Sequence, residues 1–211
     1  MTPEEVRAVT VRQPYASLIA GGHKHIEWRG PHWPRWTGPV LIHAGADWAA
    51  GWKGRWFTDR ELDGRDGRIL DAVGVDDLAE DCHHGGQYLL DRRARAVVPT
   101  GAVVAVARID RVLPVVDGLS LGLSRVPQFV VDVEGQLTEW NPFPEDFAQP
   151  GWAESVWGDE LAYSAGMCAP GNVGVCLTDI TPLTRPVRAK GRLGLWKPST
   201  ELVAECLEVV R

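Results

Sequence analysis

Alternation of apolar and polar residues predicts several short strands and one long strand. Residues 7–12 alternate around Val9 and Val11, and residues 101–116 hold the longest alternating run, which includes Arg108-Ile109-Asp110-Arg111-Val112. Shorter extended segments are expected at residues 26–29, 40–44, 128–133 and 174–177, between Pro182 and Pro186, and at the end of residues 191–196. The chain is therefore predicted to be built mainly from strands.

Two segments near the chain ends have the apolar spacing of helices. The first follows Gln13-Pro14, places Tyr15, Leu18 and Ile19 on its buried side, and ends at Gly21-Gly22. The second covers residues 199–210, with Ser199 or Thr200 as its cap and Glu201 in its first turn. Together with the strands, these helices predict an α+β fold.

The segments between the predicted strands are rich in Trp, Pro and Gly. Trp48, Trp52 and Trp56 recur every four residues and predict a helix over residues 47–56. One or two helices are expected over residues 59–73, a loop with helical pieces over 78–95, and irregular structure over 31–39 and 140–157.

Composition narrows the class of protein. The chain has 211 residues, a net charge of -6, and 45% apolar and 24% charged residues, which is typical of an ordinary globular domain. We interpret residues 1–211 as one domain. No apolar run is long enough to cross a bilayer, so no membrane partner is expected. Glu4 and Glu5 at the start do not fit a secretory signal, and a cytoplasmic location is expected.

Charge is unevenly distributed along the chain. Residues 1–60 carry 8 basic and 5 acidic residues, and residues 138–160 carry 6 acids and no base. Residues 185–197 hold Arg185, Arg188, Lys190, Arg192 and Lys197 without an acid. If the two basic ends of the chain meet in space, they form a face suited to an anionic ligand; the alternative is a solvated charged surface.

Cysteine and histidine spacing does not predict a metal site. The four cysteines form no C-x-x-C pair, and Cys82-His83-His84 stands without a second cluster that would complete a tetrahedral site. We therefore expect reduced thiols, no metal and no cofactor. The 10 Trp residues are open to two interpretations, core packing or flat surfaces that stack on bases.

Four ordered motifs resemble the ASCH domain family. They are residues 9–29 (VTVRQPYASLIAGGHKHIEWR), residues 38–44 (GPVLIHA), residues 101–108 (GAVVAVAR), and LTDITPL at 177–183 with GRLGLW at 191–196. The resemblance covers about half of the chain and implies a PUA-like fold, a small and mostly antiparallel β-barrel with flanking helices. Two large acidic insertions, at about 45–95 and 117–160, are then expected to lie outside the barrel.

The resemblance also implies a role in RNA biology. We expect binding of RNA, a nucleotide or a modified nucleobase in a cleft beside the barrel, on ligand-binding residues Arg12, Gln13, Tyr15, Lys24, Glu27, Arg29 and His43. At least one Trp or Tyr is expected within reach of the cleft. Glu27 and Arg29 lie two residues apart on a predicted strand, so both side chains share one face. Arg29 then holds Glu27 beside a base edge, and Lys24 binds phosphate.

Two other functions stay open. The first is hydrolysis of a modified nucleoside or of RNA, with Lys24 and Glu27 as the catalytic residues. The small cytidine-deacylating members carry Thr where this chain has Glu27, so the proposed nucleophile of those members is missing here. The second is a protein-interaction adaptor. The structural alternatives for single residues are an ion pair that braces the barrel mouth and, for His43, a core histidine.

Overall fold

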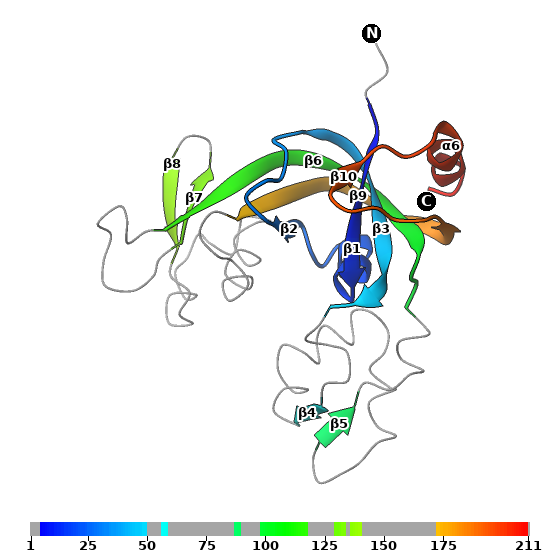
Figure 1. Cartoon of the computed structure of the whole chain (residues 1–211), viewed down its shortest axis with the longest axis horizontal. Coiled ribbons are helices and arrows are strands. Elements are labelled where there is room, and N and C mark those ends of the chain that lie inside the picture. Colours follow the sequence, from blue (N-terminus) through cyan, green and yellow to red (C-terminus); the bar gives the residue numbers. More distant parts are fainter. Residues whose placement is uncertain are drawn as a thin grey trace. The chain divides into compact units, whose positions relative to one another are not determined.

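The computed structural model describes residues 5–49, 56–58, 87–89, 98–117, 129–133, 136–140 and 172–210 (Figure 1). The chain divides into two compact units, and each is described by itself. The first unit comprises residues 1–24, 39–107 and 179–211, and the second comprises residues 25–38 and 108–178. Strands β6 and β9 each have residues in both units.

The fold is α+β, with many strands and few helices among the described residues. The elements in chain order are β1 (Arg7–Gln13), α1 (Tyr15–Ala20), β2 (Ile26–Arg29), β3 (Gly38–Trp48), β4 (Trp56–Thr58), β5 (Gln87–Leu89), β6 (Ala102–Asp117), β7 (Phe129–Val133), β8 (Gln136–Trp140), β9 (Val173–Arg188), β10 (Leu195–Trp196) and α6 (Thr200–Glu208). The expected strands at residues 7–12, 26–29, 40–44, 101–116 and 174–177 are all present.

In the first unit the sheet order is β10-β1-β3-β6. Strand β1 pairs in parallel with β3, from Arg7 opposite Val40 to Val11 opposite Ala44. On its other edge β1 pairs antiparallel with β10, where Ala8 faces Trp196. A parallel pair needs a long connection, and the chain between β1 and β3 contains both α1 and β2.

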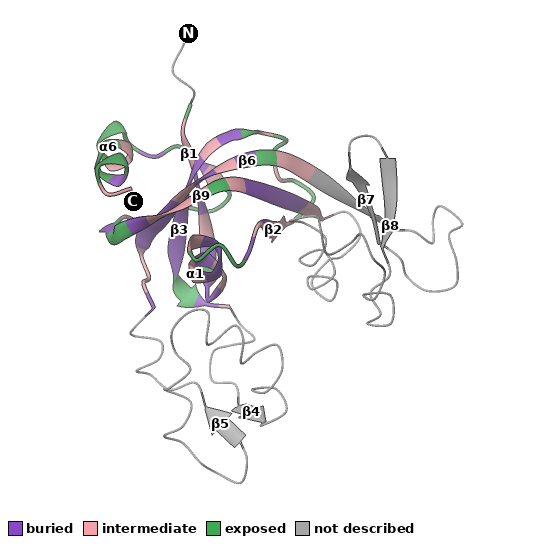
Figure 2. Ribbon diagram, turned by 180° about the vertical axis from the view of Figure 1, so that it is seen from behind, coloured by how far each residue is buried: buried purple, intermediate pink, exposed green. Residues whose placement is uncertain are grey.

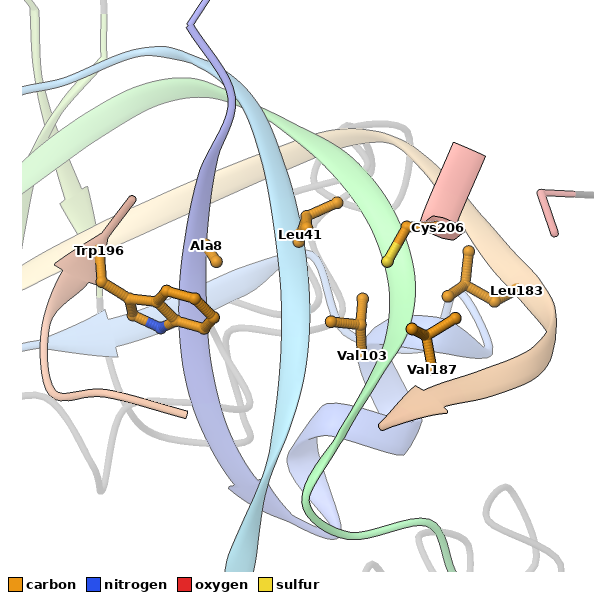
Figure 3. Close-up of a cluster of buried hydrophobic side chains, with 7 residues drawn as sticks. All are labelled: Ala8, Leu41, Val103, Leu183, Val187, Trp196 and Cys206. Carbon is orange, nitrogen blue, oxygen red and sulfur yellow. The ribbon is translucent and has the colours of Figure 1, made fainter. Parts of the chain in front are cut away.

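The sheet of the first unit curls around a core of small and branched side chains (Figure 3). Buried positions concentrate on β1, β3 and the first part of β6 (Figure 2). The core cluster takes its residues from five strands (β1, β3, β6, β9 and β10) and from α6, namely Ala8, Leu41, Val103, Leu183, Val187, Trp196 and Cys206. Burial of these apolar surfaces is the main stabilising contribution to this unit.

Helix α6 covers one edge of this core. The side chain of Ser199 accepts a hydrogen bond from the backbone N–H of Leu202 at 3.2 Å, and Glu201 lies in the first turn. The expected cap and first turn are therefore confirmed. Cys206 is the buried residue of the helix, and burial raises the pKa of its thiol to about 11.

Strand β9 is much longer than the sequence pattern suggests. The expected strand at 174–177 and the extended piece around Pro182 and Pro186 are parts of one 16-residue strand. Between these prolines, the backbone N–H of Thr184 donates to the carbonyl of Val209 at 2.8 Å. Proline cannot donate to a ladder, and here the residue between the two prolines supplies a backbone N–H to the chain end after α6.

The second unit contains two antiparallel arrangements. Strand β2 pairs with the start of β9, from Ile26 opposite Cys176 to Arg29 opposite Val173. The hairpin β7–β8 pairs with the end of β6, where Val115 faces Val131. Trp28 packs across Gly174, since a Cβ there would lie 3.0 Å from the Trp28 ring.

Two expectations for the first insertion need correction. The helix predicted over residues 47–56 is wrong at both ends, because Asp47 and Trp48 belong to β3 and Trp56 belongs to β4. Trp48 is buried and lies opposite Gln13 of β1, so sheet pairing outweighs the four-residue Trp spacing. Residues 87–89, expected as loop or helix, form β5, which pairs with β4.

Other expectations lie outside the described residues, namely the helices at 59–73, most of the loop at 78–95, the irregular segment after Trp140 and the placement of both insertions. No helix among the described residues is long and apolar enough to cross a membrane.

Candidate functional site

Lys24 lies just after the C-terminal end of α1. The chain leaves the helix through Gly21 and Gly22, and Gly22 has a φ of 74°, a left-handed conformation that favours glycine. The backbone N–H groups of His23 and Lys24 then donate to the carbonyl of Leu18 at 2.8 and 3.2 Å. This turn brings the ammonium of Lys24 to 5.9 Å from the centroid of the Tyr15 ring.

The environment of Lys24 is unusual for a lysine. Only 7% of the residue is exposed, and lysines are rarely buried this far unless their charge is compensated. The Tyr15 ring supplies a cation–π contact, and Lys24 has further interactions besides it. Lys24 and Tyr15, predicted from the sequence as ligand-binding residues, therefore lie together.

Arg12 and Gln13 are neighbours on β1 but have opposite surroundings. Arg12 is exposed, whereas Gln13 is fully buried. The Nε2 of Gln13 donates to the carbonyl of Pro99 at 2.6 Å, and its Oε1 accepts from the backbone N–H of Ser17 at 3.1 Å. The Gln13 amide thus joins β1 to the first turn of α1 and to the segment before β6, which is a structural role.

Glu27, Arg29 and Trp33 form a cluster in the second unit. The alternation of β2 places Glu27 and Arg29 on one face, and Arg29 NH2 lies 3.0 Å from Glu27 Oε1. The guanidinium carbon of Arg29 is 5.2 Å from the centroid of the Trp33 ring. The two charged side chains are 13% and 22% exposed, Glu27 being the lower. The predicted pairing of Glu27 with Arg29 is therefore present.

Trp33 adds a stacking surface and an unused donor to this cluster. It lies in the loop between β2 and β3 and is half-buried. Its indole Nε1 is buried and has no hydrogen-bond partner among the residues that the structure describes. The sequence predicts an aromatic residue near the site but does not single out Trp33, for which the Trp- and Pro-rich loop directly after β2 is the signal.

His43 lies on β3 in the first unit and is 2% exposed. Its Nε2 donates to the carbonyl of Ala189 at 3.0 Å, whereas Nδ1 is buried without a hydrogen-bond partner. Burial lowers the pKa of His43, and the hydrogen bond to Ala189 opposes this shift only in part. His43 is therefore a neutral, buried histidine in contact with the segment before β10.

The candidate residues divide between the two units. Arg12, Gln13, Tyr15, Lys24 and His43 belong to the first unit, and Glu27 and Arg29 belong to the second, because the boundary falls between Lys24 and His25. Within the units, the structure brings together Lys24 with Tyr15 and Glu27 with Arg29 and Trp33. Convergence of all of them on one cleft stays a prediction.

The described part of the chain contains no group of three or more His, Cys, Asp or Glu residues that could hold a metal ion. Cys82, His83 and His84 lie outside the described residues.

No model of a known protein family matches this chain, and no curated protein matches it either. The resemblance to ASCH domains therefore stays a hypothesis that depends on the four motifs quoted above.

Proposed function

We propose that this chain binds RNA, a nucleotide or a modified nucleobase. The observation that carries the proposal is the cluster of Glu27, Arg29 and Trp33, in which the largely buried guanidinium of Arg29 contacts both the Glu27 carboxylate and the Trp33 ring. A PUA-like barrel and a cytoplasmic location belong to the same proposal, because both follow from the sequence motifs and composition.

The chemistry of this cluster suits a nucleobase. A base edge carries donors and acceptors in one plane, and a carboxylate accepts from amino groups while a guanidinium donates to ring nitrogens and carbonyls. Aromatic and guanidinium planes both offer a stacking face. The buried Nε1 of Trp33 supplies a further donor that a ligand acceptor would satisfy. A site of this kind discriminates between bases, because a wrong base leaves buried polar groups unpaired.

Lys24, in the first unit, is proposed as an anion contact in its own right. Its ammonium is largely removed from solvent and lies against Tyr15. A cation in such surroundings attracts a phosphate more strongly than a fully hydrated one, because solvent screening is reduced. We assign the Glu27–Arg29 pair of the second unit to the base and, as a separate assignment within the first unit, Lys24 to phosphate binding.

Binding is favoured over hydrolysis by the contacts of Glu27. Its Oε1 lies 3.0 Å from Arg29, a geometry that orients the carboxylate as a fixed hydrogen-bond acceptor. The hydrolytic members that this sequence resembles carry Thr at this position, and Glu27 does not replace its hydroxyl.

The test is a ligand panel read by thermal shift and calorimetry. Nucleosides, mononucleotides and a short single-stranded RNA are added to the full chain, and chromatography checks the ligands for turnover. We expect stabilisation by at least one ligand without product. Stabilisation by none of them would contradict the proposal, and product formation would establish the hydrolase instead.

Glu27→Gln and Lys24→Ala locate the site. Each is expected to weaken binding at least tenfold while the melting temperature falls by less than about 4 °C, which corresponds to about 1 kcal/mol for a chain of this size. Glu5→Gln is the matched control, because Glu5 is also paired with an arginine at 3.0 Å but is more exposed. Clear destabilisation by Glu27→Gln with unchanged affinity would show that the pair is structural only.

A further inference from the structure

The segment between β9 and β10 is fastened to the sheet of the first unit at two points. His43 Nε2 donates to the carbonyl of Ala189 at 3.0 Å, and Thr10 Oγ1 donates to the carbonyl of Arg192 at 2.9 Å. Trp196 Nε1 in turn donates to Thr10 Oγ1 at 3.2 Å. Residues 189–192 are thus held by side chains from β1 and β3, and Trp196 of β10 bonds to the β1 side chain.

Gly191 sits directly on the side chains that hold this segment. A Cβ at this position would lie 2.6 Å from His43 Nδ1 and 2.8 Å from Thr10 Oγ1, closer than real Cβ contacts allow. The side-chain direction of Gly191 therefore points into the protein. Lys190 and Arg192, on either side of it, are both exposed. The segment that His43 and Thr10 hold thus has two cations, two residues apart, exposed to solvent.

These two cations differ from their basic neighbours. Three of the five basic side chains in residues 185–197 have partners: Arg185 lies 3.7 Å from Glu205, Lys197 lies 3.5 Å from Glu5, and Arg188 donates to the carbonyl of Thr100 at 2.9 Å. Lys190 and Arg192 have no side-chain partner among the residues that the structure describes. Their charge is left available for an external anion.

We infer that Lys190 and Arg192 form an arm that contacts the sugar–phosphate backbone of single-stranded RNA. The inference rests on the proposed function and extends it from a nucleotide to a strand. Two unpaired cations on a segment fixed by His43, Thr10 and Gly191 match a ligand with repeated negative charges. The fixed backbone lowers the entropy lost when the arm binds.

The salt dependence of RNA affinity measures how many phosphates Lys190 and Arg192 contact. Each phosphate that a cation neutralises on a single strand contributes about 0.7 to the slope of log affinity against log salt concentration. Fluorescence anisotropy with a labelled 12-nucleotide single-stranded RNA of mixed sequence, between 50 and 200 mM KCl, gives this slope. We expect the double variant Lys190→Ala/Arg192→Ala to reduce it by about 1.4, and each single variant by about 0.7.

Arg185→Ala and Lys197→Ala are the matched controls. Each removes one positive charge from the same segment, but that charge is already paired. We expect each control to reduce the slope by less than about 0.3, well below the value for one phosphate contact. If the paired and unpaired cations reduce the slope equally, the effect is one of net charge and the arm does not exist.

Gly191→Ala tests the arm without changing charge. The added methyl group displaces the segment from His43 while both cations remain, so we expect weaker RNA binding and an unchanged circular dichroism spectrum.

Leu193, which is 99% exposed beside Arg192, tests the competing possibility of an apolar protein partner. A larger loss of RNA affinity from Leu193→Ala than from the double cation variant would overturn the inference.

Mononucleotides separate this inference from the proposed function. The double variant is expected to bind the best mononucleotide of the panel as tightly as the unmodified chain, within twofold. If the unmodified chain binds that mononucleotide but its affinity for RNA is no higher, the arm is wrong and the proposed function stands. If it binds neither, both are wrong.

Discussion

Gln13 and His43 are both buried polar side chains of the first unit, yet their polar atoms differ in how completely they are hydrogen-bonded. Both polar atoms of the Gln13 amide are hydrogen-bonded, to Pro99 and Ser17. His43 has one bonded nitrogen and one buried nitrogen without a partner. A fully bonded buried group stabilises the fold, whereas a half-bonded one carries a cost that the rest of the structure must offset.

The two side chains also hold different kinds of segment. Gln13 joins β1, α1 and the segment before β6, which together we call the framework. His43 holds Ala189, from which the exposed residues Lys190, Arg192 and Leu193 follow within four positions. For these two side chains, the completely bonded amide holds the framework, and the incompletely bonded imidazole holds the segment to which we assign a contact with a ligand.

The largest loss of stability is expected when the two hydrogen bonds of the Gln13 amide are removed. Gln13→Ala leaves the carbonyl of Pro99 and the N–H of Ser17 without their partner and opens a cavity. We expect the free energy of unfolding to fall by about 3 kcal/mol, measured by urea denaturation. Arg12→Ala, at the adjacent exposed position, is the control and should change it by less than about 0.5 kcal/mol. A loss below about 1 kcal/mol for Gln13→Ala would remove the distinction between the two side chains.

A smaller loss of stability is expected when a methyl group at position 191 is placed against His43. Gly191→Ala places a methyl group too close to His43 Nδ1 and Thr10 Oγ1, so the segment must shift. Overpacking of this kind costs about 2 kcal/mol. Gly30→Ala is the control, because a Cβ there meets nothing within 4 Å. Equal stability of the two alanine variants in the same denaturation experiment would show that the segment is not held against the imidazole.

Stability should depend on pH through His43. Burial lowers the pKa of His43 below its ordinary value of 6.5, so the unfolded chain takes up a proton before the folded chain does. The stabilising contribution is therefore complete above pH 6.5 and is lost as pH falls through the lowered pKa, with a slope of at most about 1.4 kcal/mol per pH unit.

His43→Gln isolates this contribution from that of the other histidines. Glutamine retains an Nε2 donor for Ala189 and does not titrate. Urea denaturation between pH 5 and pH 8 should show a shallower pH dependence for the variant than for the unmodified chain. Identical pH profiles would mean that His43 is protonated equally easily in the folded and unfolded states.

The smallest effect on stability is expected at the arm itself. Lys190 is exposed and has no side-chain partner among the described residues, so Lys190→Ala should change the free energy of unfolding by less than about 0.5 kcal/mol. A larger loss would mean that Lys190 contributes to the fold, and its assignment to RNA binding would weaken accordingly.

Local patterns predicted much of the fold. Alternation identified β1, β2 and β6, and the Ser199 cap identified α6, because each signal is carried by residues that are close in sequence. The same patterns underestimated β3 and β9. The Trp spacing obscured the end of β3, and two prolines obscured the continuity of β9, where Thr184 between them still donates its N–H to Val209.

The candidate site was predictable in part for the same reason. The two-residue repeat of a strand places Glu27 beside Arg29 whatever the rest of the chain does, and the glycines after α1 place Lys24 close to the helix. The stacking of Arg29 on Trp33 depends on the path of the loop after β2. That path carries no periodic signal in the sequence.

The sequence by itself therefore determined which side chains share a strand face and where helices α1 and α6 lie. Only the tertiary structure decided which buried polar groups find partners. Gln13 meets Pro99 from 86 residues away, and His43 meets Ala189 from 146 residues away. The physical reason is that a backbone repeat is set by neighbouring residues, whereas the partner of a buried group is set by which distant segments the packed sheet brings beside it.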